Sequence, residues 1–405
     1  MTASAAAPVR STATASRWDE LDLLRGIAGV LMVANHVGYK WLGEATLADP
    51  LVRALVFAGS CAPVVFFTTS GIGYGLQVGS GRPADPRGLL RKVAILLVAD
   101  ALLWVGIARP VGLDFLGFIG LSMLVLDPLR RARHALPLAL LGILAVTAAR
   151  YGVGEVVKSW PGAAGLRLAL GVEAIDGISY PPLPWLAYPL TGFVLGALAR
   201  NARAFVDRRF AVVIAGLLAV ALAGTAASMW LVHGGRQLHR WGYVSLAFYA
   251  ASFVAIACTV ALALVLGRYG GALARRLLEL RGVASLALVP WHYLVIIATA
   301  TAFDVAAIGR WGYVLGTVLM VVASFALSRR TELVAKHVVA RARGDRRIPL
   351  ALAIGVALAF AVKLWVLHST PFAAVVAVVV GQVLLCVAFA LEPARVSPPA
   401  RPPAT

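Results

Sequence analysis

Two side chains that could act together in catalysis lie eleven positions apart near the start of the chain, Arg25 and His36. Arg25 carries a permanent positive charge, and His36 carries an imidazole that can take up a proton near neutral pH. In an α-helix, eleven positions come to within about 20° of three full turns and advance the chain by about 16 Å. Both side chains therefore share one face of a predicted helix, with a cation at its start and a base farther along.

The same arrangement recurs late in the chain. His292 follows Arg281 after ten residues, just as His36 follows Arg25, and each arginine begins a similar tetrapeptide, Arg-Gly-Val-Ala or Arg-Gly-Ile-Ala. If both helices start on the same side, their histidines lie at similar depth, and we predict a paired-histidine site. The alternative is that the two segments share only a sequence common to helix starts, with Pro290 bending the second helix.

The composition shows what kind of element must position these residues. Hydrophobic residues make up 60% of the 405 residues and charged residues only 14%, whereas soluble domains average about 25% charged residues. Such a chain is neither disordered nor fibrous, and its length and hydrophobicity are typical of a protein whose solvent is lipid. The predicted fold class is all-α, a polytopic integral membrane helix bundle.

Twelve segments are long and apolar enough to be candidate membrane spans. They are 21–38, 54–78, 90–108, 112–128, 135–150, 182–199, 210–232, 243–267, 283–303, 311–328, 348–367 and 371–391. The segment 135–150 is short, and 182–199 contains prolines with Trp185 at its outer edge. Either could re-enter the membrane without crossing it, so the prediction is ten to twelve spans.

The distribution of basic residues among the loops predicts which side of the membrane each loop faces. Of the 37 Lys and Arg residues, 26 fall in the termini and alternate loops on one side, 9 fall on the other side, and Arg25 and Lys363 lie within spans. Because cytoplasmic loops are enriched in Lys and Arg, both termini are predicted to be cytoplasmic. A nucleic-acid site would concentrate the net charge of +19 on one domain, so we expect lipid contact and no nucleic-acid partner. Lys363 is expected to snorkel toward the outer surface.

The predicted organisation has four parts. Residues 1–20 are a disordered cytoplasmic tail, and 21–330 are a ten-span transmembrane domain. Residues 331–391 are a basic cytoplasmic loop with two additional membrane helices, and 392–405 are a second cytoplasmic tail. No Cys and His spacing typical of zinc occurs, so no metal site is expected.

Several motifs resemble those of the membrane acyltransferase-3 family, whose relatives include the heparan-glucosaminide N-acetyltransferase-like proteins. The opening Asp22-Leu23-Leu24-Arg25-Gly26 followed by His36 is similar to the opening motif of that family. Val289 stands where the late Ser-x-x-x-Tyr-x-x-His motif usually has Tyr. The other similar segments are Phe-Phe-x-x-Ser-Gly within 62–75, Leu-Pro-Trp-Leu at 183–186, Gly-x-x-x-Gly at 192–196, and 285–292 itself.

The resemblance implies an activity and a location. It implies transfer of an acyl group from cytoplasmic acyl-CoA, with acetyl-CoA expected, to a hydroxyl or amine of a glycan or other small-molecule acceptor. His36 would be the general base, and Arg25 would attract the phosphates of CoA. A multi-pass protein of the plasma membrane is expected, and the Ala- and Arg-rich composition favours a bacterial inner membrane.

Other polar residues within spans are weaker candidates. Asp100 could orient the His36 imidazole, as in a hydrolase triad, or be a structural partner of Arg25 or of another residue. Arg281 could bind the donor together with Arg25. The hydroxyls and glycine of Thr69, Ser70 and Gly71 could let the donor approach the backbone, although small residues also favour helix packing.

Two other classes of function fit the same spans. Twelve spans with both ends inside are also typical of secondary transporters or exporters of lipid-linked or small-molecule substrates. Transporters commonly show two repeated halves, and residues 20–200 and 200–391 show no convincing match beyond the short Arg–His repeat. A non-catalytic membrane assembly factor with the same fold is the other alternative.

Overall fold

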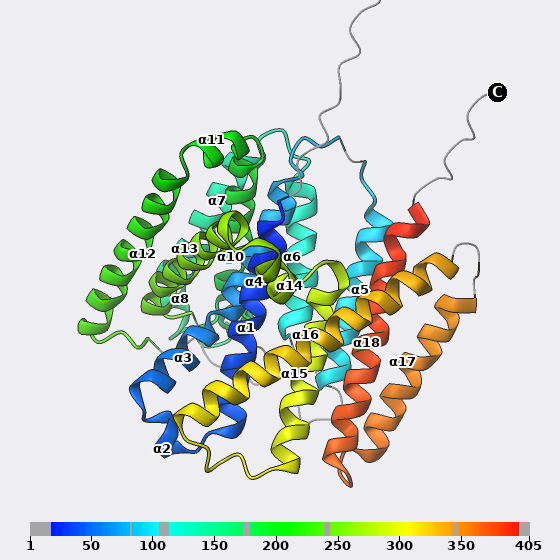
Figure 1. Ribbon diagram of the computed structural model, residues 1–405. Coiled ribbons are helices and arrows are strands. Elements are labelled where there is room, and N and C mark those ends of the chain that lie inside the picture. Colours follow the sequence, from blue (N-terminus) through cyan, green and yellow to red (C-terminus); the bar gives the residue numbers. More distant parts are fainter. Residues whose placement is uncertain are drawn as a thin grey trace, which may run out of the picture.

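The computed structural model is an all-α bundle, as predicted (Figure 1). It describes residues 18–81, 83–104, 113–172, 179–238, 244–342, 345 and 347–396. Within these residues, ten helices are long and apolar enough to cross a membrane. The predicted tails lie largely outside the described residues, since the description begins at Trp18 and ends at Val396.

Every one of the twelve predicted spans corresponds to a helix or a pair of joined helices. The long helices are α1 Glu20–Trp41, α3 Pro50–Ser60, α4 Ala62–Gly75, α5 Pro86–Trp104, α6 Phe115–Leu129, α7 Ala135–Ala148, α10 Pro182–Ala199, α12 Phe210–His233, α13 Leu246–Tyr269, α15 Gly282–Ala302, α16 Arg310–Arg341, α17 Arg347–Val366 and α18 Pro371–Val396. The short elements are α2 Glu44–Leu47, the π-helix η1 Ala149–Val153, α8 Gly154–Val157, α9 Ala164–Leu170, α11 Arg203–Arg208 and α14 Gly271–Leu278.

The two spans beyond the ten candidates are α5 and α6, which pack against each other. α5 carries charged residues both in its first turns and at Asp100, and α6 has only 15 residues. α5 also contacts α18, and α6 also contacts α4 and α10. Both helices are therefore held by protein contacts as well as by any contact with lipid.

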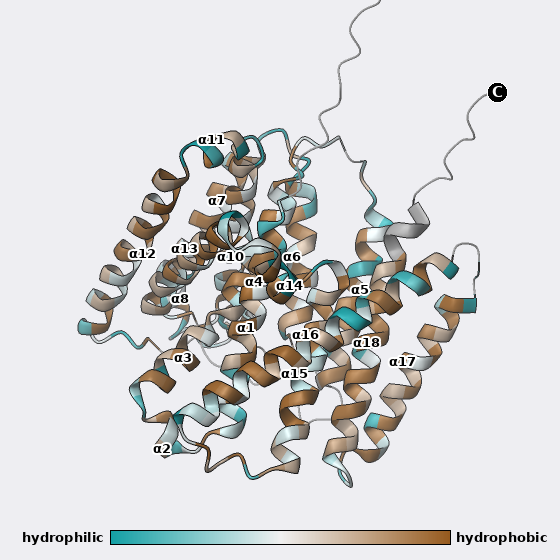
Figure 2. Ribbon diagram, viewed as in Figure 1, coloured by the Kyte–Doolittle hydropathy of each residue, from teal (hydrophilic) through white to brown (hydrophobic). Residues whose placement is uncertain are grey.

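Hydropathy follows the expected arrangement of a membrane protein. Figure 2 shows hydrophobic residues along the bodies of the helices and hydrophilic residues gathered near their ends, as at α11. α12 and α17 are largely exposed, with only 6% and 11% of their most apolar windows buried. Their exposed apolar side chains include Leu222 and Trp365, which are in contact with the surroundings of the protein. Lipid is the medium in which such surfaces are stable.

Of the two spans that the sequence left uncertain, one is longer than predicted and the other is continuous. The short span 135–150 continues through η1 and α8, so the candidate crossing runs from Ala135 to Val157. The proline-containing span is one continuous helix. Pro182 lies at its first position, where a missing N–H costs nothing, and Pro189 lies inside the helix without dividing it. Trp185 is not an interfacial anchor, since it is 0% exposed and packs edge to face against Tyr180 with ring centroids 4.8 Å apart.

Three helix ends differ from the predicted boundaries. α16 has 32 residues and reaches Arg341, so the basic loop predicted at the start of the part 331–391 begins as a helix. Lys336 and Glu332 form an ion pair of 2.8 Å there, one helical turn apart. α18 runs on to Val396, beyond residue 391. The single predicted span 54–78 is divided at Cys61 into α3 and α4, with Pro63 in the first turn of α4.

Glycines allow α4 and α10 to pack at very close range. A Cβ on Gly71 would lie 1.9 Å from the carbonyl oxygen of Pro189, and a Cβ on Gly192 would lie 1.9 Å from that of Thr68. Each glycine has a partner four residues later, Gly75 and Gly196, in the same interface. This is the small-residue packing common between membrane helices, and the Gly-x-x-x-Gly segment of 192–196 has this structural role.

Candidate active site

Two histidines from distant parts of the sequence meet inside the bundle. His36 lies on α1 and His292 on α15, and these helices contact each other. Nδ1 of His36 lies 2.9 Å from Nε2 of His292, and the ring centroids are 4.8 Å apart. His292 is 0% exposed, whereas His36 is partly exposed and lines a cavity. The predicted pairing of the two histidines at one depth is confirmed.

Hydrogen bonds determine which ring nitrogens carry protons when both rings are neutral. The carbonyl oxygen of Leu288 can only accept, so Nδ1 of His292, 2.9 Å away, donates to it. Nε2 of His292 is then an acceptor, and Nδ1 of His36 donates to it. Nε2 of His36 is left as the unprotonated nitrogen of the pair. A buried histidine thus fixes the tautomer of the histidine that lines the cavity.

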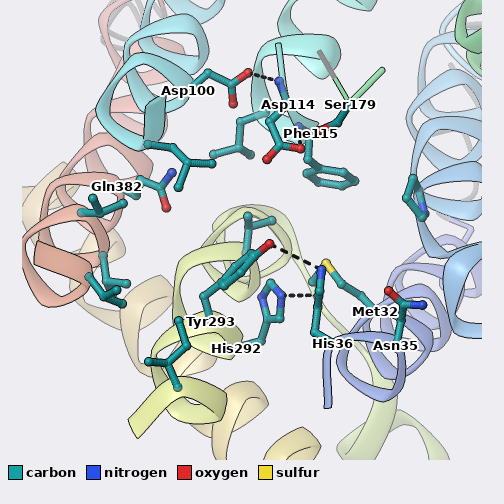
Figure 3. A pocket seen from close by; sticks show the side chains of 18 of the residues that line it. Met32, Asn35, His36, Asp100, Asp114, Phe115, Ser179, His292, Tyr293 and Gln382 are labelled. Carbon is teal, nitrogen blue, oxygen red and sulfur yellow. Dashed lines mark hydrogen bonds between the residues drawn. The ribbon is translucent and has the colours of Figure 1, made fainter. Parts of the chain in front are cut away.

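The cavity beside His36 has a volume of about 430 Å³. This volume lies in the range of small-molecule sites, roughly 300–1,000 Å³. Figure 3 shows His36, His292 and Tyr293 on one side of the cavity and Asp100 and Asp114 on the opposite side. The start of α18 and the ends of α5 and α17 also contribute lining residues. These are the helix ends that the predicted topology assigns to the outer side.

Asp100 lines this cavity but is not the orienting partner of His36. Its Oδ2 accepts a hydrogen bond of 2.7 Å from the backbone N–H of Asp114, just before α6. A Cβ on Gly117 would lie 2.1 Å from the same oxygen, so the first turn of α6 can surround this carboxylate only because residue 117 is a glycine. Among the described residues, Asp100 bonds neither His36 nor Arg25. The contacts fit the predicted structural role, with a partner other than Arg25, because the carboxylate stabilises the start of α6.

Tyr293 is a site residue that the sequence analysis missed. Its hydroxyl lies 3.5 Å from Nε2 of His36, and its ring centroid is 4.9 Å from that of His36. Val289, which stands where the late motif usually has Tyr, is one helical turn earlier and also lines the cavity. The hydroxyl that residue 289 lacks is therefore supplied from the next turn of α15. The adjacency of Tyr293 to His292 was the available signal.

Asp114, Ser179 and Asn35 also line the cavity and were not among the predicted site residues. The Asp114 carboxylate accepts from the N–H of Phe115 at 2.8 Å and so caps α6. The Asn35 amide donates to the carbonyl of Val56 at 2.9 Å, which ties α1 to α3. Asp114 and Ser179 are far apart in sequence, and only the fold brings them together.

Arg25 and Arg281 lie together, but at the other end of α1 and α15 from the histidines. Arg25 pairs with Asp22, and Nε of Arg281 lies 3.8 Å from the same carboxylate. Arg281 also pairs with Glu279. Neither arginine lines the cavity of His36. The repeated Arg–His spacing thus produces two levels, a cluster of arginines and carboxylates and a histidine pair, about 16 Å apart along the helices.

The segment Thr69, Ser70 and Gly71 does not line the cavity. The Thr69 hydroxyl donates to the carbonyl of Val65 one turn earlier, at 2.6 Å, and Thr69 is 1% exposed. Gly71 is buried against α10, and Ser70 is only partly buried. The structure gives Gly71 a packing role, and the predicted contact of this segment with the donor stays a prediction.

Lys363 does not snorkel. It is 1% exposed, and its Nζ donates to the carbonyl oxygens of Leu102 and Leu103 at 2.8 and 3.0 Å. These carbonyls belong to the last turn of α5, whose terminal C=O groups have no partner within the helix. Gln382 on α18 makes a similar contact, since its Nε2 donates to the carbonyl of Ala99 at 3.1 Å. Both polar side chains therefore fasten α17 and α18 to α5.

The site combines an unprotonated imidazole nitrogen, a hydroxyl and a carboxylate-bearing wall around one cavity. Such a nitrogen can remove a proton from a hydroxyl or amine bound in the cavity. A family model described as an acyltransferase domain matches residues 18–329 of the chain. This range includes both histidines and both arginines and ends before α17. No curated protein matches the chain.

Proposed function

We propose that this chain, which belongs to the acyltransferase-3 family and is a multi-pass membrane acyltransferase, takes its acyl group from acyl-CoA and uses His36 as general base. The observation that carries the proposal is the hydrogen-bonded histidine pair at the cavity wall, with Nε2 of His36 unprotonated. The proposed acceptor is a hydroxyl or amine of a glycan or other small molecule. The proposed location is a bacterial plasma membrane.

The proposed reaction is a direct transfer. Nε2 of His36 removes the proton from the acceptor while the acceptor oxygen or nitrogen attacks the thioester carbonyl. A C–O or C–N bond forms, the C–S bond breaks, and the proton passes from His36 to the CoA thiolate. His292 accepts from Nδ1 of His36 throughout and stabilises the imidazolium that forms. The Tyr293 hydroxyl lies 3.5 Å from Nε2 of His36. A contact of this length is weak, so an acceptor hydroxyl can readily take its place.

The polar wall opposite the histidines is suited to the proposed acceptor. Asp100, Asp114 and Ser179 line this side of the cavity, and the two carboxylates, which also accept from backbone N–H groups at the start of α6, have further lone pairs for a ligand. Carboxylates accept hydrogen bonds from hydroxyl and ammonium groups, and such bonds are stronger than those between neutral groups. An acceptor that offers several hydroxyls or an amine can thus be held across the cavity from His36.

Replacing the base tests the proposal. In purified protein supplied with acyl-CoA, His36→Gln is expected to lower the rate of CoA release by about 10²–10⁴-fold, the usual contribution of a general base. His233→Gln is the matched control, because His233 is exposed on α12 and bonds only its own helix at Met229. Near wild-type turnover in His36→Gln, with His233→Gln also unchanged, would remove His36 from the mechanism.

The arginine cluster is proposed to attract the CoA phosphates. Arg25→Gln is expected to raise KM for acyl-CoA by about 10–100-fold, the value of one hydrogen bond to a charged group, with kcat changed much less. Arg209→Gln, an exposed arginine after α11, is the control. An unchanged KM in Arg25→Gln would mean that Arg25 does not bind CoA and serves only in its ion pair with Asp22.

A further inference from the structure

The helices α17 and α18 lie outside the residues that the family model matches, yet they form one wall of the cavity. α18 is not a peripheral addition, because it packs against α5, α15, α16 and α17. Lys363 and Gln382 fix the pair to α5 through backbone carbonyls. The chain beyond the family domain thus completes the site that the domain begins.

The wall contributed by α18 is aliphatic. Its cavity-lining residues are spaced three and four apart, so they form one face of the helix: Pro371, Ala374, Val375, Val378, Val379 and Gln382. This face extends for about 16 Å, and Leu367, just after the end of α17, adds to it. The amino groups of Lys363 and Gln382 are bonded to α5, and Gln382 lies at the far end of this face. The remaining surface of this wall offers a substrate van der Waals contact and no charge.

The two sides of the cavity therefore suit different parts of the reactants. The polar side holds the groups that can bind an acceptor, and the α18 face can hold only an apolar group without leaving polar atoms unpaired. The apolar part of the proposed donor is the chain behind its carbonyl. Acetyl carries a single methyl group there, which leaves most of a 16 Å face unused.

We propose that the α18 face binds the aliphatic chain of the acyl group, and that the enzyme therefore prefers acyl groups longer than acetyl. This inference rests on the acyl-CoA donor proposed above. Each methylene group buried against the wall is expected to improve kcat/KM by roughly fourfold until the face is filled. The helix pair beyond the family domain is then the element that selects chain length.

The first test compares acetyl-, butyryl-, hexanoyl- and octanoyl-CoA as donors for the full-length protein in lipid nanodiscs. Wild type is expected to favour the longer chains. Val375→Trp, which projects into the cavity, should lower kcat/KM for octanoyl-CoA by roughly tenfold or more with little effect on acetyl-CoA. Val378→Ala should shift the preference toward longer chains. Val380→Trp is the control, since Val380 lies on the same helix, is 47% exposed and does not line the cavity.

Two results of this test would overturn the inference. One is a wild-type preference for acetyl-CoA. The other is an equal loss with every donor in Val375→Trp, which would assign the face to an apolar part of the acceptor.

The second test does not depend on CoA or on His36. Val375→Cys is labelled with a small maleimide in the presence of octanoate or acetate, and octanoate is expected to slow labelling far more than acetate. Val380→Cys controls for effects of octanoate on the lipid, and the unsubstituted protein gives the background from Cys61, Cys258 and Cys386. Protection by octanoate without turnover of any acyl-CoA would refute the proposed donor and keep the aliphatic site. Turnover without chain-length preference or protection would refute the aliphatic site and keep the proposed function.

Discussion

At His36, one ring nitrogen is bonded to His292 at 2.9 Å, and the other meets the Tyr293 hydroxyl at the longer distance of 3.5 Å. That division depends on His292, whose own Nδ1 is held by the Leu288 carbonyl. The spacing of both Arg–His segments predicted that the two histidines would lie at one depth. It could not predict the tautomers, because these follow from which carbonyl and which ring nitrogen lie opposite each other. Nor could it place Asp100, whose carboxylate is occupied by the start of α6.

His292 is a positioning residue, and its replacements should separate that role from simple packing. His292→Leu is expected to lower kcat by about 10²-fold or more with KM for the donor little changed, since loss of the tautomer-fixing partner in a hydrolase triad lowers kcat by about 10⁴-fold. His292→Gln keeps a side-chain acceptor and should recover part of kcat. Steady-state kinetics of both variants makes the comparison. If kcat is equal in the two variants, the hydrogen bond that His292 accepts from His36 does not contribute to catalysis.

Among the helices, the pair α4 and α10 shows that a segment resembling a functional motif can also have a packing role, the alternative that the sequence left open. The Ser-Gly and Gly-x-x-x-Gly segments resemble functional motifs, yet their glycines mainly allow two backbones to approach. Span positions were predictable, because long apolar runs have few other stable arrangements in lipid. The length of α16 and the break at Cys61 were not, because helix ends depend on contacts with neighbouring helices.

Adding one methyl group to α4 tests this packing. Gly71→Ala is expected to destabilise the protein by about 1–3 kcal/mol, because the new Cβ would meet the Pro189 carbonyl at 1.9 Å. Gly73→Ala on the same helix is the control, since its nearest neighbour, Leu21 Cδ2, would be 4.0 Å away. Thermal unfolding in detergent measures both. If Gly71→Ala instead keeps wild-type stability and raises KM for acyl-CoA, the segment binds the donor after all.

For the molecule as a whole, the distribution of charge assigns the two ends of the bundle to opposite sides of the membrane. The loop that carries α11 lies at one end and α2 lies at the other (Figure 1). The cavity of His36 is near the ends of α5 and α17 and the start of α18, so it belongs to the predicted outer half. The arginine cluster belongs to the predicted cytoplasmic half. The phosphates of the proposed donor would therefore be bound in the cytoplasmic half, and its acyl group would react in the outer half.

Cysteine labelling in intact cells tests this orientation. A membrane-impermeant maleimide should label Ala45→Cys in α2 without treatment and Ala204→Cys in α11 only after the membrane is permeabilised. Both positions are exposed in the structure. The unsubstituted protein should label weakly, because Cys61 and Cys386 are buried and Cys258 lies within the long α13. The reverse labelling pattern would place the proposed CoA-binding cluster outside the cell.

The histidine pair also has a consequence for how the protein is made. His36 and His292 are separated by 256 positions, so the ribosome delivers the first long before the second. Until α15 is inserted, the imidazole on α1 lacks the His292 ring nitrogen that it bonds in the complete bundle, and until α18 follows, the cavity lacks a wall. On the proposed mechanism, the site is complete only once α18 is in place. A chain that stops before α15 or α18 would then transfer no acyl group, and membrane insertion would have the part that removal of a pro-segment has in other enzymes.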